Sequence, residues 1–414
     1  MLTNYIKIAW KVLLRHPFYT FITLFGISLT LTVLMVLTAF IDHLVGSHYP
    51  ETNRYRSLYI ERIKLEDSTR SSMMSTSMSY RFLADMTKTL KAPERVSIFS
   101  TPHGSNAYAG SRKIKLDTKF TDANFWHVME FEFLEGKPYN EQNINNGEFV
   151  AVITDRVKEE YFDNPDEPAV GKSIELENVT YRVIGVVRGV PLTRLFTAAD
   201  VYFPYTVPKS NYQNTGHTGN YQAILLSKGK KEMEEVRNEF QGRISQLPLP
   251  GVEGWFKYAV LTVPSEPYVE NFLGMLFSRR DTVAIFFGVV SFLMLMIMGL
   301  PTINLINLNV SRIMERSSEI GIRKAFGAPI RTLLWQFIIE NIFITFIGGA
   351  VALAFTLTII YLINSSGWIA HADLTINLSV FAVSVFLCLL FGLLSGVLPA
   401  LRMSKLSIIE ALKS

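Results

Sequence analysis

The chain has few of the residues on which several protein classes depend. Its 414 residues include one cysteine, Cys388, so no disulfide can form within the chain, and a zinc site built from several cysteines is excluded. Only 18% of the residues are charged, whereas a soluble domain usually carries about 25%. Together with a hydrophobic share of 49%, this deficit indicates membrane-buried segments and argues against a disulfide-stapled secreted protein.

Several catalytic and nucleotide-binding motifs are also missing. There is no GxxxxGK[ST] phosphate loop, no HExxH zinc motif and no GxSxG nucleophile elbow, and the 7 histidines are scattered along the chain. We therefore expect a non-catalytic protein that holds no metal and no ATP of its own.

Four stretches contain no Asp, Glu, Lys, Arg or His, and we predict each as a transmembrane helix. They are residues 18–41, 282–311, 341–370 and 374–401. A bilayer core of about 30 Å needs about 20 apolar residues in a helix, so each stretch is long enough. The first is longer than the apolar part of a signal peptide, so we expect it to stay as an anchor. The absence of charge inside these stretches disfavours ion-driven transport.

The distribution of charge orients these helices. Residues 1–17, 312–340 and 402–414 carry 11 basic and 4 acidic residues, whereas residues 42–281 carry 29 basic and 31 acidic ones. The loop at 371–373 has no Lys or Arg. The positive-inside rule therefore predicts cytoplasmic termini and a cytoplasmic 312–340 loop, with 42–281 and 371–373 on the outer side.

Residues 42–281 are the only segment large enough for a soluble core, and we predict an α+β domain there, between the first and second membrane helices. The predicted strands are 57–65, 112–120, 149–154, 181–188 and 222–227. The predicted helices are 79–90 and 230–247, and 211–221 is predicted as a polar loop.

Two clusters in this domain allow a chemical interpretation. Met73, Met74 and Met78 could bind Cu(I) through thioethers, but a flexible polar loop over residues 68–79 is the favoured interpretation. The acidic run Glu130, Glu132 and Glu135 could supply an acid/base pair; we favour a solvated face.

The cytoplasmic loop has defined helix signals. Glu319 and Arg323 lie one helical turn apart in the favourable order, Gly327 can end a helix and Pro329 can begin the next. An ordinary charged connector would fit these charges. We favour a docking element, because the helix breakers are combined with interleaved Ile and Arg residues.

This loop carries a family resemblance. Residues 319–328, EIGIRKAFGA, resemble the signature between the second and third spans of FtsX-like/MacB-type ABC transporter permeases. Residues 8–15 are similar to the start of such permeases, and 395–405 with 409–412 to their end. Further resemblances to their extracytoplasmic domain lie at 170–174 and 181–187.

The resemblance implies a permease subunit without a fused ATPase, with an FtsX-like domain at about 282–414. It implies a dimer with an identical or paralogous permease, and cytosolic ABC ATPase subunits that bind ATP and Mg and drive movement of the periplasmic domain. MacB-like efflux of drugs, peptides or other envelope substrates, with a periplasmic adaptor and an outer-membrane channel as further partners, would follow. The residues implied to contact the ATPase are Glu319, Ile320, Gly321, Arg323, Lys324, Gly327 and Ala328.

Further residues are expected to act at the membrane. Lys7, Lys11 and Arg15 share one face of an amphipathic helix over 1–17 and would meet anionic lipid; a plain positive flank is the alternative. Candidates for helix packing are Asn304, Asn307, Gly392 and Gly396.

The expected location is the bacterial inner membrane, with the large domain in the periplasm. Two other functions stay open. One is a membrane-anchored sensor whose outer domain binds a ligand without any ATPase. The other is a membrane-embedded enzyme, against which the missing catalytic motifs count.

Overall fold

The computed structural model describes residues 11, 13–15, 17–67, 73–109, 112–248, 252–253, 256–277, 283–297, 299, 330–366, 374–376, 378–387 and 389–390. The chain divides into two compact units. One, which we name the outer domain, comprises Leu44–Val283 and Ile369–Ala372. The other, the helical unit, comprises Met1–His43, Ala284–Trp368 and Asp373–Ser414.

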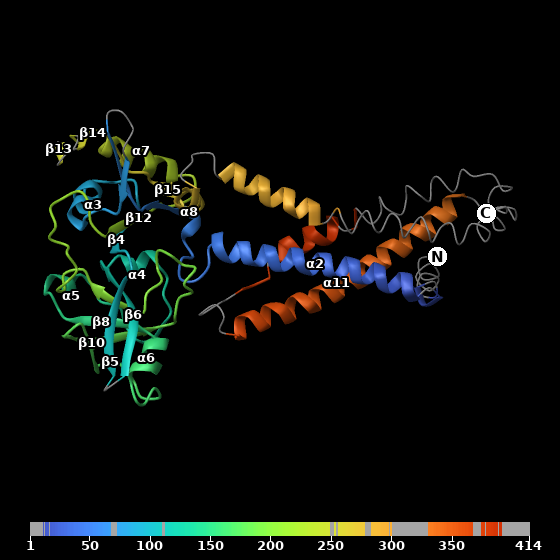
Figure 1. The fold of residues 1–414 in the computed structure, drawn as a ribbon, viewed down its shortest axis with the longest axis horizontal. Coiled ribbons are helices and arrows are strands. Elements are labelled where there is room, and N and C mark those ends of the chain that lie inside the picture. The colour runs from blue at the N-terminus through green and yellow to red at the C-terminus, as the bar shows by residue number, and fades with distance from the viewer. Residues whose placement is uncertain are drawn as a thin grey trace. The chain divides into compact units, whose positions relative to one another are not determined.

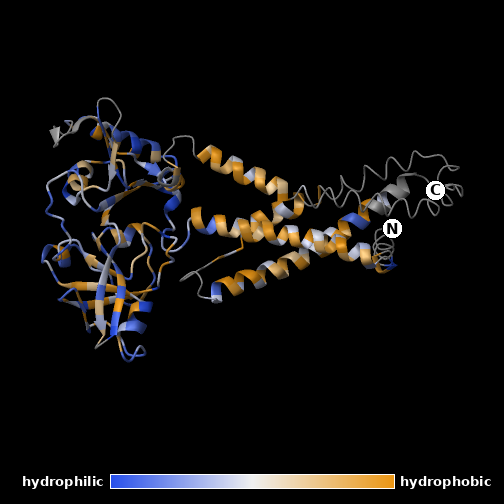
Figure 2. Cartoon of the chain, in the orientation of Figure 1, coloured by the Kyte–Doolittle hydropathy of each residue, from blue (hydrophilic) through white to orange (hydrophobic). Residues whose placement is uncertain are grey.

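The helical unit is built on two long apolar helices, α2 (Pro17–Val45) and α11 (Ile330–Ser365). Figure 2 shows that apolar residues run along both helices. By length and composition, Pro17–Val45 and Ile338–Ser365 can cross a membrane, and two shorter apolar helices cover Val283–Ile297 and Leu378–Leu387. Apolar helices on both sides of the outer domain in sequence are confirmed, and the count of four spans stays a prediction.

The two long helices touch where α11 carries a pair of glycines. A Cβ added at Gly348 would lie 2.7 Å from Cγ2 of Ile27 on α2, whereas one at Gly349 would have no atom nearer than 3.8 Å. Close by, the Thr32 hydroxyl donates to the carbonyl of Ala352 at 3.3 Å. A residue without a side chain therefore lets the backbones approach, as small residues do between membrane helices.

The outer domain is an α+β domain, as predicted, with two sheets (Figure 1). The strands of the larger sheet are β1 (Ser57–Ile60), β4 (Arg95–Ser100), β5 (His103–Ala109), β6 (Arg112–Thr121), β7 (Phe133–Gly136), β8 (Val150–Thr154), β9 (Ser173–Leu176), β10 (Val179–Val187), β11 (Val201–Pro204), β12 (Tyr221–Leu226) and β15 (Glu266–Pro267). The smaller sheet consists of β2 (Ile63–Asp67), β3 (Met73–Thr76), β13 (Val252–Glu253) and β14 (Phe256–Thr262).

The larger sheet closes on itself in one part and stays open in the other. Its order is β11-β8-β10-β9-β5-β6-β4-β12-β1-β15, β7 pairs with β10, and β11 also pairs in parallel with β6. Six strands from β11 to β6 therefore form a closed ring, and β4, β12, β1 and β15 extend from it. The described helices that complete the domain are η1 (Arg54–Arg56), α3 (Tyr80–Thr87), α4 (Phe125–Val128), α5 (Glu141–Asn145), α6 (Asp155–Tyr161), α7 (Met233–Ile244) and α8 (Tyr268–Phe277).

Apolar side chains cover both faces of the open part of the sheet. On β1, Leu58 and Ile60 join one buried cluster while Tyr59 joins the other, and neighbouring β12 divides in the same way. Phe82 of α3 and Phe240 of α7 pack in the first cluster. Such burial of alternate residues on both faces makes this sheet the rigid centre of the domain.

Most predicted elements of the domain are confirmed, and two are wrong. The segment predicted as one strand over 57–65 is two, because the chain leaves the larger sheet after Ile60 and enters the smaller one at Ile63, with both side chains buried in the same cluster. The loop predicted over 68–79 contains β3, which pairs with β2. Met73 and Met74 lie exposed on β3, whereas Met78 is buried in the core.

Candidate functional site

Most residues singled out in the sequence lie outside the part of the chain that the structure describes. This holds for the ATPase-coupling residues within 319–328, for Asn304, Asn307, Gly392 and Gly396, and for Lys7. Lys11 and Arg15 are described, helical and exposed. Their predicted role at the lipid surface stays a prediction.

The three acidic residues at 130–135 are described, and each is tied to a different part of the domain. Glu130 accepts a hydrogen bond from the Thr52 hydroxyl at 2.7 Å. Glu135 pairs with Lys158 at 2.5 Å and accepts from the Ala169 N–H, and the pKa of Glu135 lies below its ordinary value because these bonds outweigh the effect of burial. Glu132 lies 3.7 Å from Arg188. The three carboxylates therefore have separate partners in the domain.

The two connections of the outer domain to the apolar helices meet in the sheet. β1 is the first strand after α2, and β15 directly precedes α8, which leads toward the next apolar helix. These two strands pair antiparallel, with Leu58 opposite Pro267 and Tyr59 opposite Glu266. The incoming and outgoing segments are therefore joined by backbone hydrogen bonds.

A buried polar cluster reinforces this connection. We name it the joint, and it consists of Glu51, Arg54, Arg194, Thr197 and Tyr268, each at most 3% exposed. Arg54 binds the Glu51 carboxylate with Nε at 2.8 Å and Nη2 at 2.7 Å. The Thr197 hydroxyl donates to the other Glu51 oxygen at 2.6 Å. The guanidinium carbon of Arg54 lies 3.5 Å from the ring centre of Tyr268, the first residue of α8.

The joint also holds the chain as it leaves α2. Nη1 of Arg54 donates to the carbonyls of Leu44 and Gly46 at 2.8 and 2.9 Å, and Nη1 of Arg194 donates to Gly46 at 3.2 Å. Carbonyls at a helix C-terminus lack partners within the helix and carry partial negative charge, so cations are favourable there. Two buried arginines therefore fix the start of the outer domain.

Electrostatics keep the joint charged. Burial alone would raise the pKa of Glu51, but the charge of Arg54 and the Thr197 hydrogen bond outweigh it and hold this pKa below its ordinary value. Burial alone would lower the pKa of Arg54, but the charge of Glu51 and the neighbouring Tyr268 and Tyr59 together raise it above its ordinary value. Burial and the nearby charge of Arg54 lower the pKa of Arg194. One carboxylate thus faces two arginines.

A buried lysine lies beside the joint. Lys119 of β6 is fully buried, and its Nζ donates to the carbonyls of Phe196 and Leu195, in the loop that also carries Arg194 and Thr197. Burial lowers the pKa of Lys119 to about 7, although the charge of Glu51 opposes this shift. Its amine therefore changes charge near neutral pH.

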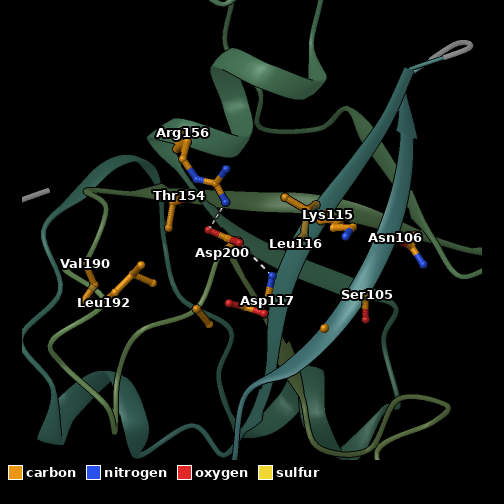
Figure 3. A pocket seen from close by; sticks show the side chains of 12 residues that line it. Ser105, Asn106, Lys115, Leu116, Asp117, Thr154, Arg156, Val190, Leu192 and Asp200 are labelled. Atoms are coloured by element: carbon orange, nitrogen blue, oxygen red, sulfur yellow. Dashed lines mark hydrogen bonds and ion pairs between the residues drawn. The ribbon is translucent and has the colours of Figure 1, made fainter. Parts of the chain in front are cut away.

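A second feature is an open groove of about 560 Å³ on the closed ring (Figure 3). Asp200 lies at its centre, paired with Arg156 at 2.6 Å and accepting a hydrogen bond from the Asp117 N–H at 2.8 Å. The groove is lined by Gly104, Ser105, Asn106, Lys115, Leu116, Asp117, Thr154, Arg156, Val190, Leu192, Ala199 and Asp200.

Sequence reasoning missed both features. Glu51 and Arg54 are three residues apart, a spacing that allows an ion pair, but nothing local connects them to Arg194 or Tyr268. The groove depends on the parallel pairing of β6 with β11, which also joins distant segments. Long-range pairing of this kind leaves no pattern within either segment.

Two family models match the chain. Residues 20–243 match the MacB-like periplasmic core domain, and residues 280–408 match the FtsX-like permease C-terminal domain. Both matches agree with the order of motifs in the sequence. Between them they cover most of the outer domain and the segments that contain the apolar helices.

Three curated relatives are similar over much of the chain. The pyoverdine export ATP-binding/permease protein PvdT of Pseudomonas fluorescens (strain Pf0-1) is 24% identical over 423 residues, which cover 100% of this chain and 60% of that protein. The uncharacterized ABC transporter permease YvrN of Bacillus subtilis (strain 168) is 22% identical over 430 residues, 99% of each. The macrolide export ATP-binding/permease protein MacB of Shewanella sp. (strain W3-18-1) is 25% identical over 309 residues, 73% of this chain and 44% of that protein. The chain therefore spans less than two thirds of PvdT and MacB, and nearly the whole length of YvrN.

Proposed function

The chain belongs to the ABC transporter permeases that combine a MacB-like periplasmic core domain with an FtsX-like permease domain, and we propose that it relays ATP-driven movement from a cytosolic ATPase partner to its outer domain. The similarity to YvrN over 99% of both lengths supports a permease role. In this proposal the chain itself is not an enzyme, and ATP and Mg are bound by the ATPase.

The joint and the β1–β15 pair carry this proposal. A relay needs a stiff connection, because movement of a helix reaches a domain only if the linking segment does not absorb it. Here the carbonyls at the end of α2 are bound by Arg54, and Arg54 also packs on Tyr268 at the start of α8. The segments that enter and leave the domain would then move it as one body.

We further propose four membrane helices with both termini in the cytoplasm of a bacterial inner membrane, and the outer domain in the periplasm. The two long apolar helices and the two shorter ones support this number. The excess of basic residues in 1–17, 312–340 and 402–414 supports the orientation.

The contact with the ATPase is assigned to the cytoplasmic loop. Glu319, Ile320, Gly321, Arg323, Lys324, Gly327 and Ala328 would form the coupling element. A second permease chain would complete the transporter, and a periplasmic adaptor with an outer-membrane channel would extend it. Export of drugs, peptides or other envelope substrates is the proposed activity, supported by the export functions in the names of PvdT and MacB.

Affinity purification of the full chain from its native membrane in mild detergent tests this proposal. We expect a stoichiometric ABC ATPase with vanadate-sensitive hydrolysis. Glu319→Arg and Gly327→Pro should each remove that ATPase, because one reverses a charge and the other breaks the turn, while the control Ser317→Ala should retain it.

Two results would count against the assignment. Unchanged ATPase association in both variants would show that the coupling element lies elsewhere. A well-folded homo-oligomer without any ATPase would favour the sensor function instead.

A further inference from the structure

One edge of β6 lies beside the groove without a neighbouring described strand. The hydrogen bonds of Asp117 show which backbone groups of β6 point toward this edge. The Asp117 N–H donates to Oδ2 of Asp200 at 2.8 Å, and the Asp117 carbonyl accepts from the Asp200 N–H at 2.7 Å. Both backbone groups of Asp117 therefore point away from β5, its antiparallel neighbour. Because strand residues alternate with a period of two, the backbone groups of Lys115 and Lys113 point the same way.

Further along β6 this edge is occupied. Residues Thr118 to Thr121 pair with β11, and the Asp200 carboxylate takes the next position. Among the strands that the structure describes, none pairs with Lys115 or Lys113 on this side. In the described part of the chain, the position that β11 occupies beside Thr118 to Thr121 is therefore not filled by a strand beside Lys115 and Lys113.

The open stretch has defined ends. At the far end the Arg112 guanidinium donates to the carbonyl of Glu160 in α6. Arg156, in the first turn of α6, faces the edge across the groove (Figure 3). The groove, which Lys115, Leu116 and Asp117 of β6 line, holds about 560 Å³ and is open to solvent. One short extended segment fits such a space, since an added strand lies only about 4.8 Å from the strand with which it pairs.

The exposed charged side chains on this strand are three basic residues and the acidic Asp117. Arg112, Lys113 and Lys115 are exposed on the open stretch, and no ion pair is recorded for Lys113 or Lys115 in the described part of the chain. Lysine on an edge strand opposes pairing with a like-charged copy and favours an acidic partner. The Asp200 carboxylate already shows that an acidic oxygen satisfies an N–H of this edge.

Apolar contacts are also available. Leu192 lines the groove and is 65% exposed, next to the buried Val190. Figure 3 shows both side chains on the side of the groove opposite the strand. A segment that alternates acidic and aliphatic residues would place charge near the lysines and apolar groups near Leu192.

We propose that this groove binds an extended acidic segment of a partner protein, which adds as a strand to the open edge of β6. Backbone hydrogen bonds to Lys115 and Lys113 would provide affinity, and the positive side chains would provide selectivity. This inference concerns the outer domain and does not depend on ATPase coupling, so either proposal can fail without the other.

A peptide titration on the full chain in detergent micelles tests the proposal. The probe is fluorescein-labelled Thr-Val-Glu-Val-Glu-Val-Thr, followed by fluorescence polarisation, and the charge control replaces both Glu by Lys. Two further probes carry N-methyl groups either on the Glu residues or on the second and third Val. An added strand turns only one of these two sets of amides toward β6, so we expect one methylated peptide to lose binding and the other to keep it.

The protein variants are Lys115→Ala, which removes the charge, and Lys115→Pro, which removes the N–H as well. Proline is tolerated on a strand edge whose N–H points to solvent, and circular dichroism checks the fold. We expect Lys115→Pro to bind about tenfold more weakly than Lys115→Ala. If Lys115→Pro misfolds, the methylated peptides on the unaltered protein decide.

Several outcomes would overturn the proposal. They are no binding of the acidic probe, equal binding of the Lys peptide, equal effects of the two methylation patterns, or equal affinity of folded Lys115→Pro and Lys115→Ala.

Discussion

The joint and the groove use the same kinds of side chain for opposite purposes. In the joint, Glu51 and Arg54 are almost fully buried and paired with each other, and Arg54 also donates to backbone carbonyls. In the groove, Lys115 is exposed at a strand edge where no described strand pairs. Buried charge fixes one arrangement, because leaving it unpaired is costly. Exposed charge beside unpaired backbone leaves room for a partner.

Under the two proposals, this difference makes one domain stiff where movement would enter and open where a partner would bind. The joint is built where the chain connects to the apolar helices, and the groove is built on the closed ring of strands. The two are linked through β6, which contributes Lys119 beside the joint and Lys115 to the groove. Substitutions in the joint should therefore change the stability of the domain, whereas substitutions in the groove should change the binding of a partner.

The largest effect is expected for Arg54→Met, which breaks the joint. It leaves the Glu51 carboxylate buried without its main partner, so we expect a loss of about 3–5 kcal/mol in the unfolding free energy of the outer domain. Pulse proteolysis in urea on the full chain measures this loss. The double variant Glu51→Gln/Arg54→Met should recover part of it, since the unpaired carboxylate is gone while Arg194 stays buried without its acidic neighbour. Equal losses in the single and double variants would contradict the assignment of the joint as an ionic cluster.

A smaller effect is expected from Lys119. Its folded pKa of about 7 lies below its unfolded value, so between pH 7 and about 10 the unfolded chain binds more protons than the folded one, and stability should rise with pH. From pH 7 to 9 the rise should be about 2 kcal/mol.

Lys119→Met removes the titrating amine and should flatten this rise. Unfolding in urea at pH 7, 8 and 9 compares the two proteins. The same slope in Lys119→Met as in the unaltered chain would assign the titration to another group.

The contact between α2 and α11 offers a matched pair of variants. Gly348→Ala adds a Cβ at 2.7 Å from Ile27 and should destabilise the helical unit by about 1–2 kcal/mol, whereas Gly349→Ala meets only ordinary contacts and should be tolerated. The apparent Tm of the full chain in detergent measures both. A larger loss in Gly349→Ala would contradict the observed helix contact.

The smallest effect is expected at the acidic run. Lys158→Ala removes a pair with Glu135 that is partly exposed to solvent, so we expect a loss of less than about 1 kcal/mol in stability. The same proteolysis assay measures this loss. A loss as large as that of Arg54→Met would contradict the claim that the Lys158–Glu135 pair contributes less to stability than the joint.

Local patterns predicted much of this molecule. The alternation of residues 112–120 predicted β6, and Ser79 caps α3 where the helix was expected to begin. Apolar length identified Pro17–Val45 and Ile338–Ser365 as helices able to cross a membrane. In each case the signal lies within the element itself.

What could not be predicted depends on contacts between distant segments. Arg54 meets Tyr268 because β1 pairs with β15, which directly precedes Tyr268, and Glu51 meets Thr197 from the distant segment before β11. The chain also changes sheet between Ile60 and Ile63, and the buried residues shift there from even to odd positions, although the sequence was read as one strand. The alternation of residues in a strand shows which side chains face the core, but it does not show which other strands pair with it.

The central claim is that β1 and β15 stay joined while the transporter works. It is tested most directly by a disulfide between Leu58→Cys and Pro267→Cys, which lie opposite each other in antiparallel strands, in a chain that also carries Cys388→Ala. Vanadate-sensitive ATP hydrolysis of the purified complex with its ATPase is compared between the oxidised and reduced forms of this one variant. We predict equal activity in both forms, because the bond would tether segments that already move together. Loss of hydrolysis on oxidation, restored by reduction, would show that the strands separate during the cycle and would contradict the account.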